Sequence, residues 1–344
     1  MSLEKEITIY DLARQLNISI ATVSRALNDD PVVSKKTKKR IFDLASELGY
    51  RHNRFASSLR KQKTNTIGVI VPKVNSNFIA NVLAGIESIA TEAGYDIIIA
   101  TSSEKAEKEK NNAENLFHKR VDGLLVSLSF DTQDLRHYAP FESKGIPVVF
   151  FDRVEEKSDT IKVVIDNYAC GYEATEHLIA QGCKRIAMVS ASLQRNVYAQ
   201  RHKGYCEAHR AHGIAIDESL LLIEDLSEQS ALEAAADILK MSPLPDGLFV
   251  TNDFVAAVIM QALKEKGVRI PEDIAVVGFN NDVISKLVEP KLSTIDYPGF
   301  DMGQLVTRNL INHLKGGTDL RQTSTIVMRT QLIVRESSLK KQND

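Results

Sequence analysis

The sequence predicts a small all-α head, residues 1–63, followed by an α/β core of two doubly wound lobes with parallel sheets. Short amphipathic helical patterns without strands fill the head, whereas from Thr66 short apolar runs alternate with longer amphipathic ones. The alternating part spans about 270 residues, more than one doubly wound sheet usually takes, so we expect two lobes.

Charge divides the chain at the same place. The 344 residues carry 43 Lys and Arg against 45 Asp and Glu, a formal net charge of −2. Residues 1–63 hold 13 basic and 7 acidic side chains, a net of +6, so the remainder holds 30 basic and 38 acidic ones, a net of −8. A basic head on an acidic body indicates a nucleic-acid partner for the head.

Composition excludes several classes of protein. Hydrophobic residues make up 43% and charged residues 26%, which argues against a disordered or fibrous chain. The three cysteines have no framework spacing and are expected to be reduced thiols. No apolar run reaches the ~18 residues of a membrane helix, and the polar N-terminus lacks a signal-peptide pattern. We therefore expect a cytoplasmic, nucleoid-associated protein with no membrane partner.

The head is expected to begin with a helix-turn-helix. Thr8 is the candidate N-cap of a first helix, with Asp11 at its third position, and the inward face is spaced i, i+3, i+4, i+7: Ile9, Leu12, Ala13 and Leu16. A second short helix follows Ser19, and Ser34 caps a third that stops at Gly49. One more short helix is expected at 53–60, before a polar linker at 61–65.

The second helix carries small and polar residues outward: Ile20, Ala21, Thr22, Ser24, Arg25 and Asn28. Small residues allow close approach to a major groove about 12 Å wide, where Arg25 can donate to guanine O6 and N7. The hydroxyls and the amide can bond phosphates or bases. A small helical bundle with a solvated face is the alternative, but the local charge favours DNA binding.

The core shows the alternation expected of parallel sheets covered by helices on both faces. Strands are expected at 67–71, 96–100, 123–128, 147–151, 163–165, 185–190, 220–223, 247–251 and 275–278. Helices are expected near 78–93, 105–119, 170–181, 200–212, 228–240 and 254–267.

Polar residues stand where several of these strands end, which is where doubly wound sheets bind ligands. The candidates are Asn77, Phe78, Asp152, Arg153, Arg195, Arg201, Asn252, Asp253 and Asn280. Amides, carboxylates and an aromatic face suit a polyhydroxylated ligand, and arginine also suits a phosphate or carboxylate. As alternatives, Asp152 and Asp253 cap helices or bond backbone, and Arg195 is a solvated loop charge.

The head contains an ordered set of motif residues: 9–13 (IYDLA), Ser19, 22–28 (TVSRALN), Val33, Ser34, Thr37, Gly49, Tyr50, Asn53, Arg54, Ala56 and Leu59. In these residues it resembles the DNA-binding domain of the lactose/galactose repressor (LacI/GalR) family. The resemblance implies that Ile20, Ala21 and Arg25 read bases. It implies backbone contacts from Tyr10, Thr22, Ser24, Asn28 and Ser34, and we add Ser19, Asn53, Arg54, Ala56 and Arg60 to the DNA-binding set.

The same resemblance makes 53–60 a hinge helix that folds on DNA, with Leu59 as a wedge that opens the central base step of a palindrome. His52 stands where the family usually has proline, which alters entry into this helix.

The core resembles the regulatory core of these repressors, which is similar to periplasmic sugar-binding proteins. The segments that match include 146–153 (IPVVFFDR), 201–205 (RHKGY) and 251–282 (TNDFVAAVIMQALKEKGVRIPEDIAVVGFNND). The resemblance implies an effector (a sugar, sugar phosphate or purine) held by Phe78, Asp152, Arg153, Arg201, Asn252 and Asn280, with Arg195 matching the purine-binding branch. Asn280 replaces a common Asp, which makes an anionic effector easier to accommodate. The lobes are expected at 64–166 with 297–325, and at 167–296 with 326–340.

Together these features predict a ligand-responsive, sequence-specific transcriptional regulator, expected to be a repressor, that binds palindromic operator DNA. One head reads one half-site, so a palindrome requires a homodimer, and the helix at 78–91 is a candidate interface. About nine residues follow Arg335, too few for a tetramer-forming coiled coil. No phosphate-loop or nucleophile motif is present, so we expect no enzyme, cofactor or metal. A free-standing sugar-binding protein is the alternative, and the attached basic head counts against it.

Overall fold

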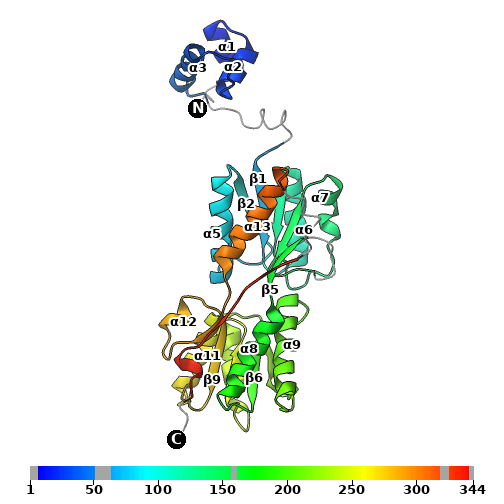
Figure 1. The fold of residues 1–344 in the computed structure, drawn as a ribbon, viewed down its shortest axis with the longest axis vertical. Coiled ribbons are helices and arrows are strands. Elements are labelled where there is room, and N and C mark those ends of the chain that lie inside the picture. The colour runs from blue at the N-terminus through cyan, green and yellow to red at the C-terminus, as the bar shows by residue number, and fades with distance from the viewer. Residues whose placement is uncertain (1–6, 51–62, 156–160, 318–324, 341–344) are drawn as a thin grey trace, which may run out of the picture. The chain divides into compact units, whose positions relative to one another are not determined.

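The computed structural model describes residues 7–50, 63–155, 161–317 and 325–340, and the chain divides into two compact units, residues 1–64 and 65–344 (Figure 1). The helix expected at 53–60 lies outside the described residues. So do five residues expected to bind DNA, and His52: Asn53, Arg54, Ala56, Leu59 and Arg60.

The first unit contains the three helices that the sequence predicts, α1 (Ile9–Leu16), α2 (Ile20–Leu27) and α3 (Lys35–Glu47). Asp11 accepts hydrogen bonds from the amide and hydroxyl of Thr8 at 2.9 and 2.6 Å, which closes the start of α1. The turn into α2 passes through a left-handed residue, Asn17, with φ 51°. The helices enclose a small apolar core: Leu12, Ala13, Val23, Ala26, Val33, Ile41 and Ala45.

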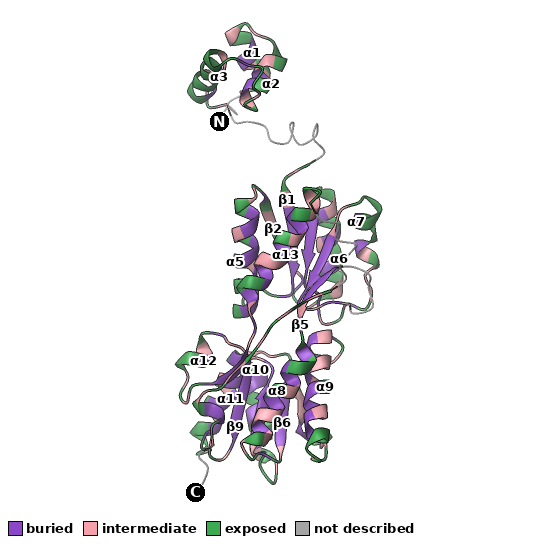
Figure 2. Cartoon of the chain, in the orientation of Figure 1, coloured by how far each residue is buried: buried purple, intermediate pink, exposed green. Residues whose placement is uncertain are grey.

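The second unit begins with a six-stranded sheet in the order β11-β5-β4-β3-β1-β2, in which every pairing is parallel. Its strands are β1 (Thr66–Val71), β2 (Asp96–Thr101), β3 (Gly123–Val126), β4 (Val148–Phe151), β5 (Lys162–Ile165) and β11 (Thr325–Met328). One face packs on α5 (Asn77–Glu92) and α13 (Gly299–Leu314), and the other on α6 (Ala106–His118) and α7 (Ala139–Ser143). Figure 2 shows the strands as the buried layer.

The second lobe repeats this plan in the order β12-β10-β9-β8-β6-β7. Its strands are β6 (Ile186–Ser190), β7 (Leu221–Ile223), β8 (Gly247–Val250), β9 (Ala275–Asn280), β10 (Ser293–Asp296) and the antiparallel β12 (Leu332–Ile333). Helices α8 (Asn167–Ala180) and α9 (Asn196–Ala211) cover one face. The other face is covered by α10 (Glu228–Lys240) and α11 (Asp253–Glu265), and the short α12 spans Ile284–Leu287.

The fold class expected from the sequence is confirmed, and the structure adds elements that the patterns did not predict. They include the helices α7, α12 and α13, the strand β10, and the strands β11 and β12, which lie at the sheet edges beyond β5 and β10. Because β11 hydrogen-bonds to β5, residues 326–328 belong to the first lobe, whereas the sequence placed them in the second. The chain passes between the lobes after β5, after β10, and between β11 and β12.

Candidate functional site

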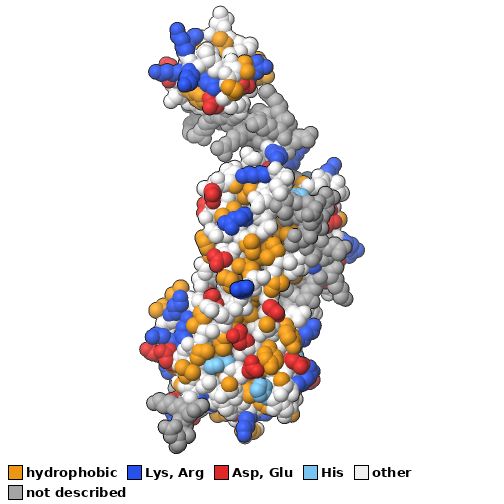
Figure 3. Space-filling view, in the orientation of Figure 1, with side chains coloured by type: hydrophobic (Ala, Val, Ile, Leu, Met, Phe, Trp, Pro, Cys, Tyr) orange, Lys and Arg blue, Asp and Glu red, His pale blue; other side chains and the backbone are white. Residues whose placement is uncertain are grey.

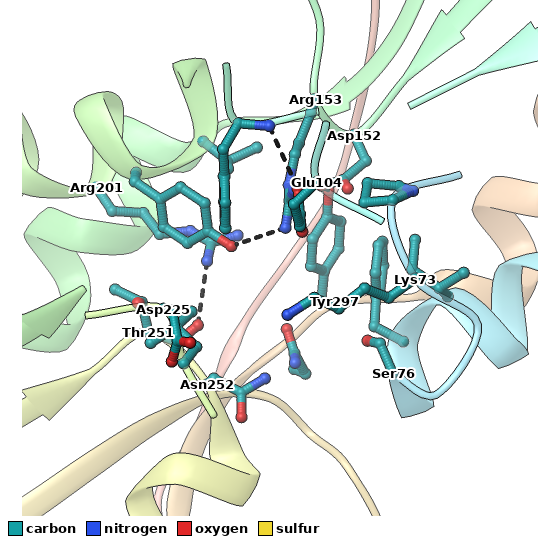
Figure 4. A pocket seen from close by; sticks show the side chains of 18 residues that line it. Lys73, Ser76, Glu104, Asp152, Arg153, Arg201, Asp225, Thr251, Asn252 and Tyr297 are labelled. Atoms are coloured by element: carbon teal, nitrogen blue, oxygen red, sulfur yellow. Dashed lines mark hydrogen bonds and ion pairs between the residues drawn. The ribbon is translucent and has the colours of Figure 1, made fainter. Parts of the chain in front are cut away.

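A cavity of about 110 Å³ lies between the two lobes, where the carboxyl ends of strands from both sheets face each other (Figure 4). Residues of the first lobe, of the second lobe and of the connection after β10 line it: Pro72, Lys73, Ser76, Phe78, Ile79, Glu104, Phe130, Asp152, Arg153, Val197, Tyr198, Arg201, Asp225, Leu226, Thr251, Asn252, Asn280 and Tyr297. This is the position at which open α/β sheets bind small molecules.

Six residues that the sequence proposed as effector contacts line this cavity: Phe78, Asp152, Arg153, Arg201, Asn252 and Asn280. The rings of Phe78 and Tyr297 stack with centroids 4.0 Å apart and form an apolar wall. Asn252 has a second role, because its side-chain oxygen accepts a hydrogen bond from the amide of Val255 at 3.1 Å and caps α11.

Arg201 is the central cation of the site, and its position follows from the close crossing of α8 and α9. It is 3% exposed, its Nε donates to the Asn167 side-chain oxygen at 2.9 Å, and its guanidinium lies 3.5 Å from the centroid of Phe279. Burial lowers the pKa of Arg201, although the neighbouring Tyr198 hydroxyl opposes this shift. The side chain thus presents a fixed, desolvated cation to the cavity, suited to a hydroxyl or carbonyl oxygen.

Asp152 directly follows β4 and is held in a left-handed conformation, with φ 58°. Its carboxylate accepts hydrogen bonds from the Ser127 hydroxyl at 3.1 Å and the Tyr297 hydroxyl at 2.9 Å. Burial, and then the charge of Asp152, raise the pKa of Tyr297 well above its usual range, so the phenol stays a donor. Asp152 therefore orders one wall of the cavity as well as facing it.

Three other residues expected to bind an effector do not line the cavity and instead bond other protein groups. Asn77 donates to the Asp282 carboxylate at 2.9 Å, and Arg195 donates to the Thr132 carbonyl; both bonds join the two lobes. Asp253 lies beneath the site, where it accepts from the Thr294 hydroxyl at 2.7 Å and the amide of Asp282 at 2.8 Å.

These three environments differ from those that a surface position would give. Arg195 is 6% exposed rather than solvated, and its Nε has no hydrogen-bond partner within the described part of the chain. Burial raises the pKa of Asp253 to about 7. Asp253 thus makes only structural hydrogen bonds among the contacts described, as the alternative expected. Asp152 makes structural hydrogen bonds and also lines the cavity.

Several cavity residues were not among the candidates, although the rule that found the others applies to them. Glu104 follows β2 and Asp225 follows β7, so both stand just past the carboxyl end of a strand. Tyr198 lies one turn before Arg201 on α9, and Tyr297 directly follows β10. The first two were detectable from strand ends alone, whereas the last required the strand at 293–296 to be recognised.

In the head, the outward face of α2 is open for contact. Ile20, Ala21 and Arg25 are exposed, as is Tyr10 on α1, whose side chain is 62% exposed. Ser19 caps α2 through the amide of Thr22 at 3.1 Å, and the Asn28 amide donates to the carbonyl of Ser24 at 2.7 Å. The polar residues that border this face are therefore pre-ordered.

The third helix of the head also carries exposed basic side chains. Lys35, Lys36, Lys39 and Arg40 of α3 are exposed, and Ser34 caps the helix by accepting from the amide of Thr37 at 3.2 Å. Figure 3 shows Lys and Arg gathered on this part of the head. The N-termini of α2 and α3 present backbone amides and positive charge, a combination suited to phosphate groups.

The described residues contain no cluster of three His, Cys, Asp or Glu side chains with the geometry of a metal site. Cys206 contacts His202 at 3.4 Å, and His209 bonds the carbonyl of Tyr205, so the closely spaced Cys206, His209 and His212 do not converge. Among the same described residues, no helix is long and apolar enough to span a membrane.

The whole chain matches known proteins. Residues 8–53 match the model "Bacterial regulatory proteins, lacI family", and residues 64–333 match "Periplasmic binding proteins and sugar binding domain of LacI family". The chain is 34% identical to the HTH-type transcriptional regulator RegA of Clostridium saccharobutylicum, over 96% of this chain and 99% of RegA.

Solved structures agree in fold. The lac repressor dimer bound to operator and the anti-inducer ONPF has a TM-score of 0.87 at 26% identity, covering 98% of this chain and 100% of that one. The complex of the transcriptional regulator CelR with cellobiose has a TM-score of 0.72 at 28% identity, covering 97% and 100%. The chain therefore belongs to the lacI family of bacterial regulatory proteins and is a DNA-binding transcriptional regulator, not an enzyme, with a helix-turn-helix head and a periplasmic-binding-protein-like core.

Proposed function

We propose that this protein is a repressor that binds a palindromic operator as a homodimer in the cytoplasm and is switched by a sugar or sugar derivative bound between the lobes of its core. The observation that carries the proposal is the interlobe cavity, in which buried polar side chains and a stacked aromatic pair converge. Hydrogen-bonding groups beside an aromatic face match the alternating hydroxyl and C–H surfaces of a sugar. The relative solved with cellobiose is similar over nearly the whole chain.

The switch would act through contacts that join the lobes around the cavity. On one side Asn77 bonds Asp282, and on the other the Asn196 side chain accepts from the amide of Val154 at 2.9 Å and donates to the carbonyl of Asp152 at 3.1 Å. A ligand held between the lobes adds bonds only when the lobes are close together. It therefore shifts the population towards the closed arrangement by its difference in affinity for the two states.

Dimerisation is supported by apolar side chains left exposed on the core. Ile99 lies on the edge strand β2, Val283 precedes α12, and Leu287 is the last residue of that helix and is 72% exposed. The exposed residues of α5, the helix expected at the interface, include small or short side chains and a carboxylate: Ala80, Asn81, Ala84 and Glu87. An isologous pairing would bury these side chains and bring two heads to one palindrome.

The first test is selection of DNA from a random pool by the full chain, followed by fluorescence anisotropy on the enriched sequence. We expect a two-fold symmetric site whose binding weakens steeply with salt, because lysines and arginines displace counterions from phosphates. Enrichment of no palindrome, or binding as a monomer, would contradict the proposal.

The second test separates sensing from DNA binding. A thermal-shift screen of sugars, sugar phosphates and purines identifies a ligand, and its effect on operator binding is then measured. Arg201→Ala should abolish the ligand response and leave operator affinity intact, whereas Leu59→Ala should weaken operator binding and leave ligand binding intact. Arg210→Ala is the matched control, because Arg210 lies on the same helix but pairs with Glu207 at the surface.

A further inference from the structure

Inside the cavity, the carboxylate of Glu104 forms an ion pair with the guanidinium of Arg153, a cation that a negatively charged ligand would also contact. Both carboxylate oxygens of Glu104 accept from Nη1 of Arg153, at 2.9 and 2.8 Å, while Nη2 donates to the Tyr198 hydroxyl at 3.2 Å. The side chains are only 12% and 13% exposed, so this pair is shielded from solvent. Figure 4 shows Glu104 and Arg153 side by side at one wall of the cavity.

The backbone around Glu104 holds its side chain in this ion pair. Ser103 and Glu104 both have left-handed conformations, with φ 52° and 60°, which is uncommon for two consecutive residues other than glycine. The amide of Ser103 donates to the carbonyl of Pro72 at 2.9 Å, and the amide of Phe130 donates to the Glu104 carboxylate at 3.2 Å. Strained residues of this kind persist only where their surroundings hold them, and they gather at ligand sites.

The charges that line the cavity balance. Its cations are Lys73, Arg153 and Arg201, and its carboxylates are Glu104, Asp152 and Asp225. The guanidinium of Arg153 also lies 4.3 Å from the centroid of the Phe130 ring, which packs on one of its faces. A phosphate or carboxylate that approaches Arg153 therefore meets an existing ion pair and not an unpaired guanidinium.

We propose that Glu104 is a specificity-determining residue that excludes anionic ligands from Arg153, so that the cavity takes an uncharged one. The proposal rests on the proposed function, in which this cavity is the effector site. An anion that binds Arg153 must displace Glu104 and leave its buried carboxylate without a cationic partner, or approach that carboxylate as a like charge. An uncharged polyol pays neither cost, because its hydroxyls can donate to the carboxylates and accept from the guanidinium groups.

This inference reverses the expectation drawn from Asn280. A single amide in place of a carboxylate favours an anionic effector, but Glu104 and Asp225 supply negative charge from other loops of the same cavity. The whole set of lining side chains, and not one position, sets the preference.

The test uses the full-length protein, inorganic phosphate as the probe and Glu104→Gln as the variant. Glutamine keeps the length of the side chain and removes the charge that neutralises Arg153. Glu107→Gln is the matched control, since Glu107 is exposed on the first turn of α6 and makes the same change in net charge. Thermal unfolding and calorimetry are recorded against phosphate, with chloride at matched ionic strength as the reference.

We expect wild type and Glu107→Gln to show no saturable stabilisation by phosphate, and Glu104→Gln to bind it about tenfold or more tightly. The double variant Glu104→Gln with Arg153→Gln should lose this gain. A Glu104→Gln protein that binds phosphate no better than wild type overturns the proposal. If Glu104→Gln does not fold, the wild-type protein still tests the proposal. Saturable binding of phosphate to the wild type that neutral sugars displace would also overturn the proposal. None of these measurements involves DNA, so a failure of this proposal can be distinguished from a failure of the protein to bind an operator.

Discussion

The crossing of α8 and α9 offers a direct test of how the effector cavity is positioned. The helices approach so closely that a Cβ on Gly171 would lie 2.1 Å from the carbonyl oxygen of Arg201, and one on Gly204 would lie 2.1 Å from that of Tyr168. Real Cβ atoms keep at least 3.0 Å from such atoms. Gly171→Ala must therefore push the helices apart by about 0.9 Å, the difference between these distances.

The cost follows from what Gly171→Ala meets. Overpacking a close contact costs about 1–3 kcal/mol, and a backbone oxygen cannot rotate away as a side chain can, so we take the upper value, ~3 kcal/mol. Alanine in a helix interior regains about 1 kcal/mol relative to glycine. The net loss is about 2 kcal/mol, or a fall of roughly 4–8 °C in the Tm of the core.

The same movement reaches the ligand site. The 2.9 Å bond from Arg201 on α9 to Asn167 on α8 would lengthen beyond hydrogen-bonding distance if the helices separate by that amount. We therefore expect weaker effector binding together with the lower Tm. Operator binding by the head should persist below the new Tm.

The assay is differential scanning calorimetry of Gly171→Ala, with Gly317→Ala as the control. Gly317 has its nearest neighbour atom at 3.4 Å, an ordinary contact, so alanine fits there. The reasoning is refuted if Gly171→Ala unfolds within about 1 °C of wild type, a change well below the computed loss. It is also refuted if the control falls by as much.

Three further predictions concern single contacts. Burial raises the pKa of Asp253 to about 7 against an ordinary 3.8, so the contribution of Asp253 to stability falls as pH rises from about 4 to 7, and this contribution to the change in Tm should be absent in Asp253→Asn. Asn196→Ala removes two hydrogen bonds between the lobes and should weaken the ligand found by the thermal-shift screen roughly tenfold in calorimetry, with operator affinity unchanged. Tyr205→Phe removes the 2.7 Å bond to the buried carbonyl of Ile186 and should destabilise the core by about 1–2 kcal/mol in thermal unfolding.

Local sequence patterns predicted most of the fold, because they describe elements whose burial is one-sided or complete. The strand β1 is apolar and almost wholly buried, and α1 has an apolar face closed by the Thr8–Asp11 pair. Two of the missed strands, β11 and β12, lack such a pattern. β11 alternates exposed and half-buried residues, and β12 has two residues, so their pairing with β5 and β10 is fixed by tertiary structure and not by local preference.

The site was predictable to the extent that one topological rule applies. Strand ends led to Asp152 and Asn252, both of which line the cavity. The rule does not say which way a side chain turns once the lobes pack. Arg195 also follows a strand of the second lobe, yet it reaches the carbonyl of Thr132 in the first lobe. The direction of such a side chain depends on the distance between two loops that are far apart in sequence.

The balance of charges in the cavity was the feature that the sequence alone could least predict. Glu104 follows β2 and Arg153 follows β4, and they are 49 residues apart in the chain. The sheet order places β1 and β3 between these strands, so the ion pair reaches across two strands and forms beyond their carboxyl ends. Summing the charges of residues along the sequence cannot reveal such an ion pair, just as the total charge of −2 conceals a net charge of +6 on the head and −8 on the core. A long-range ion pair can thus cancel a cation that local sequence reasoning counts as available to a ligand.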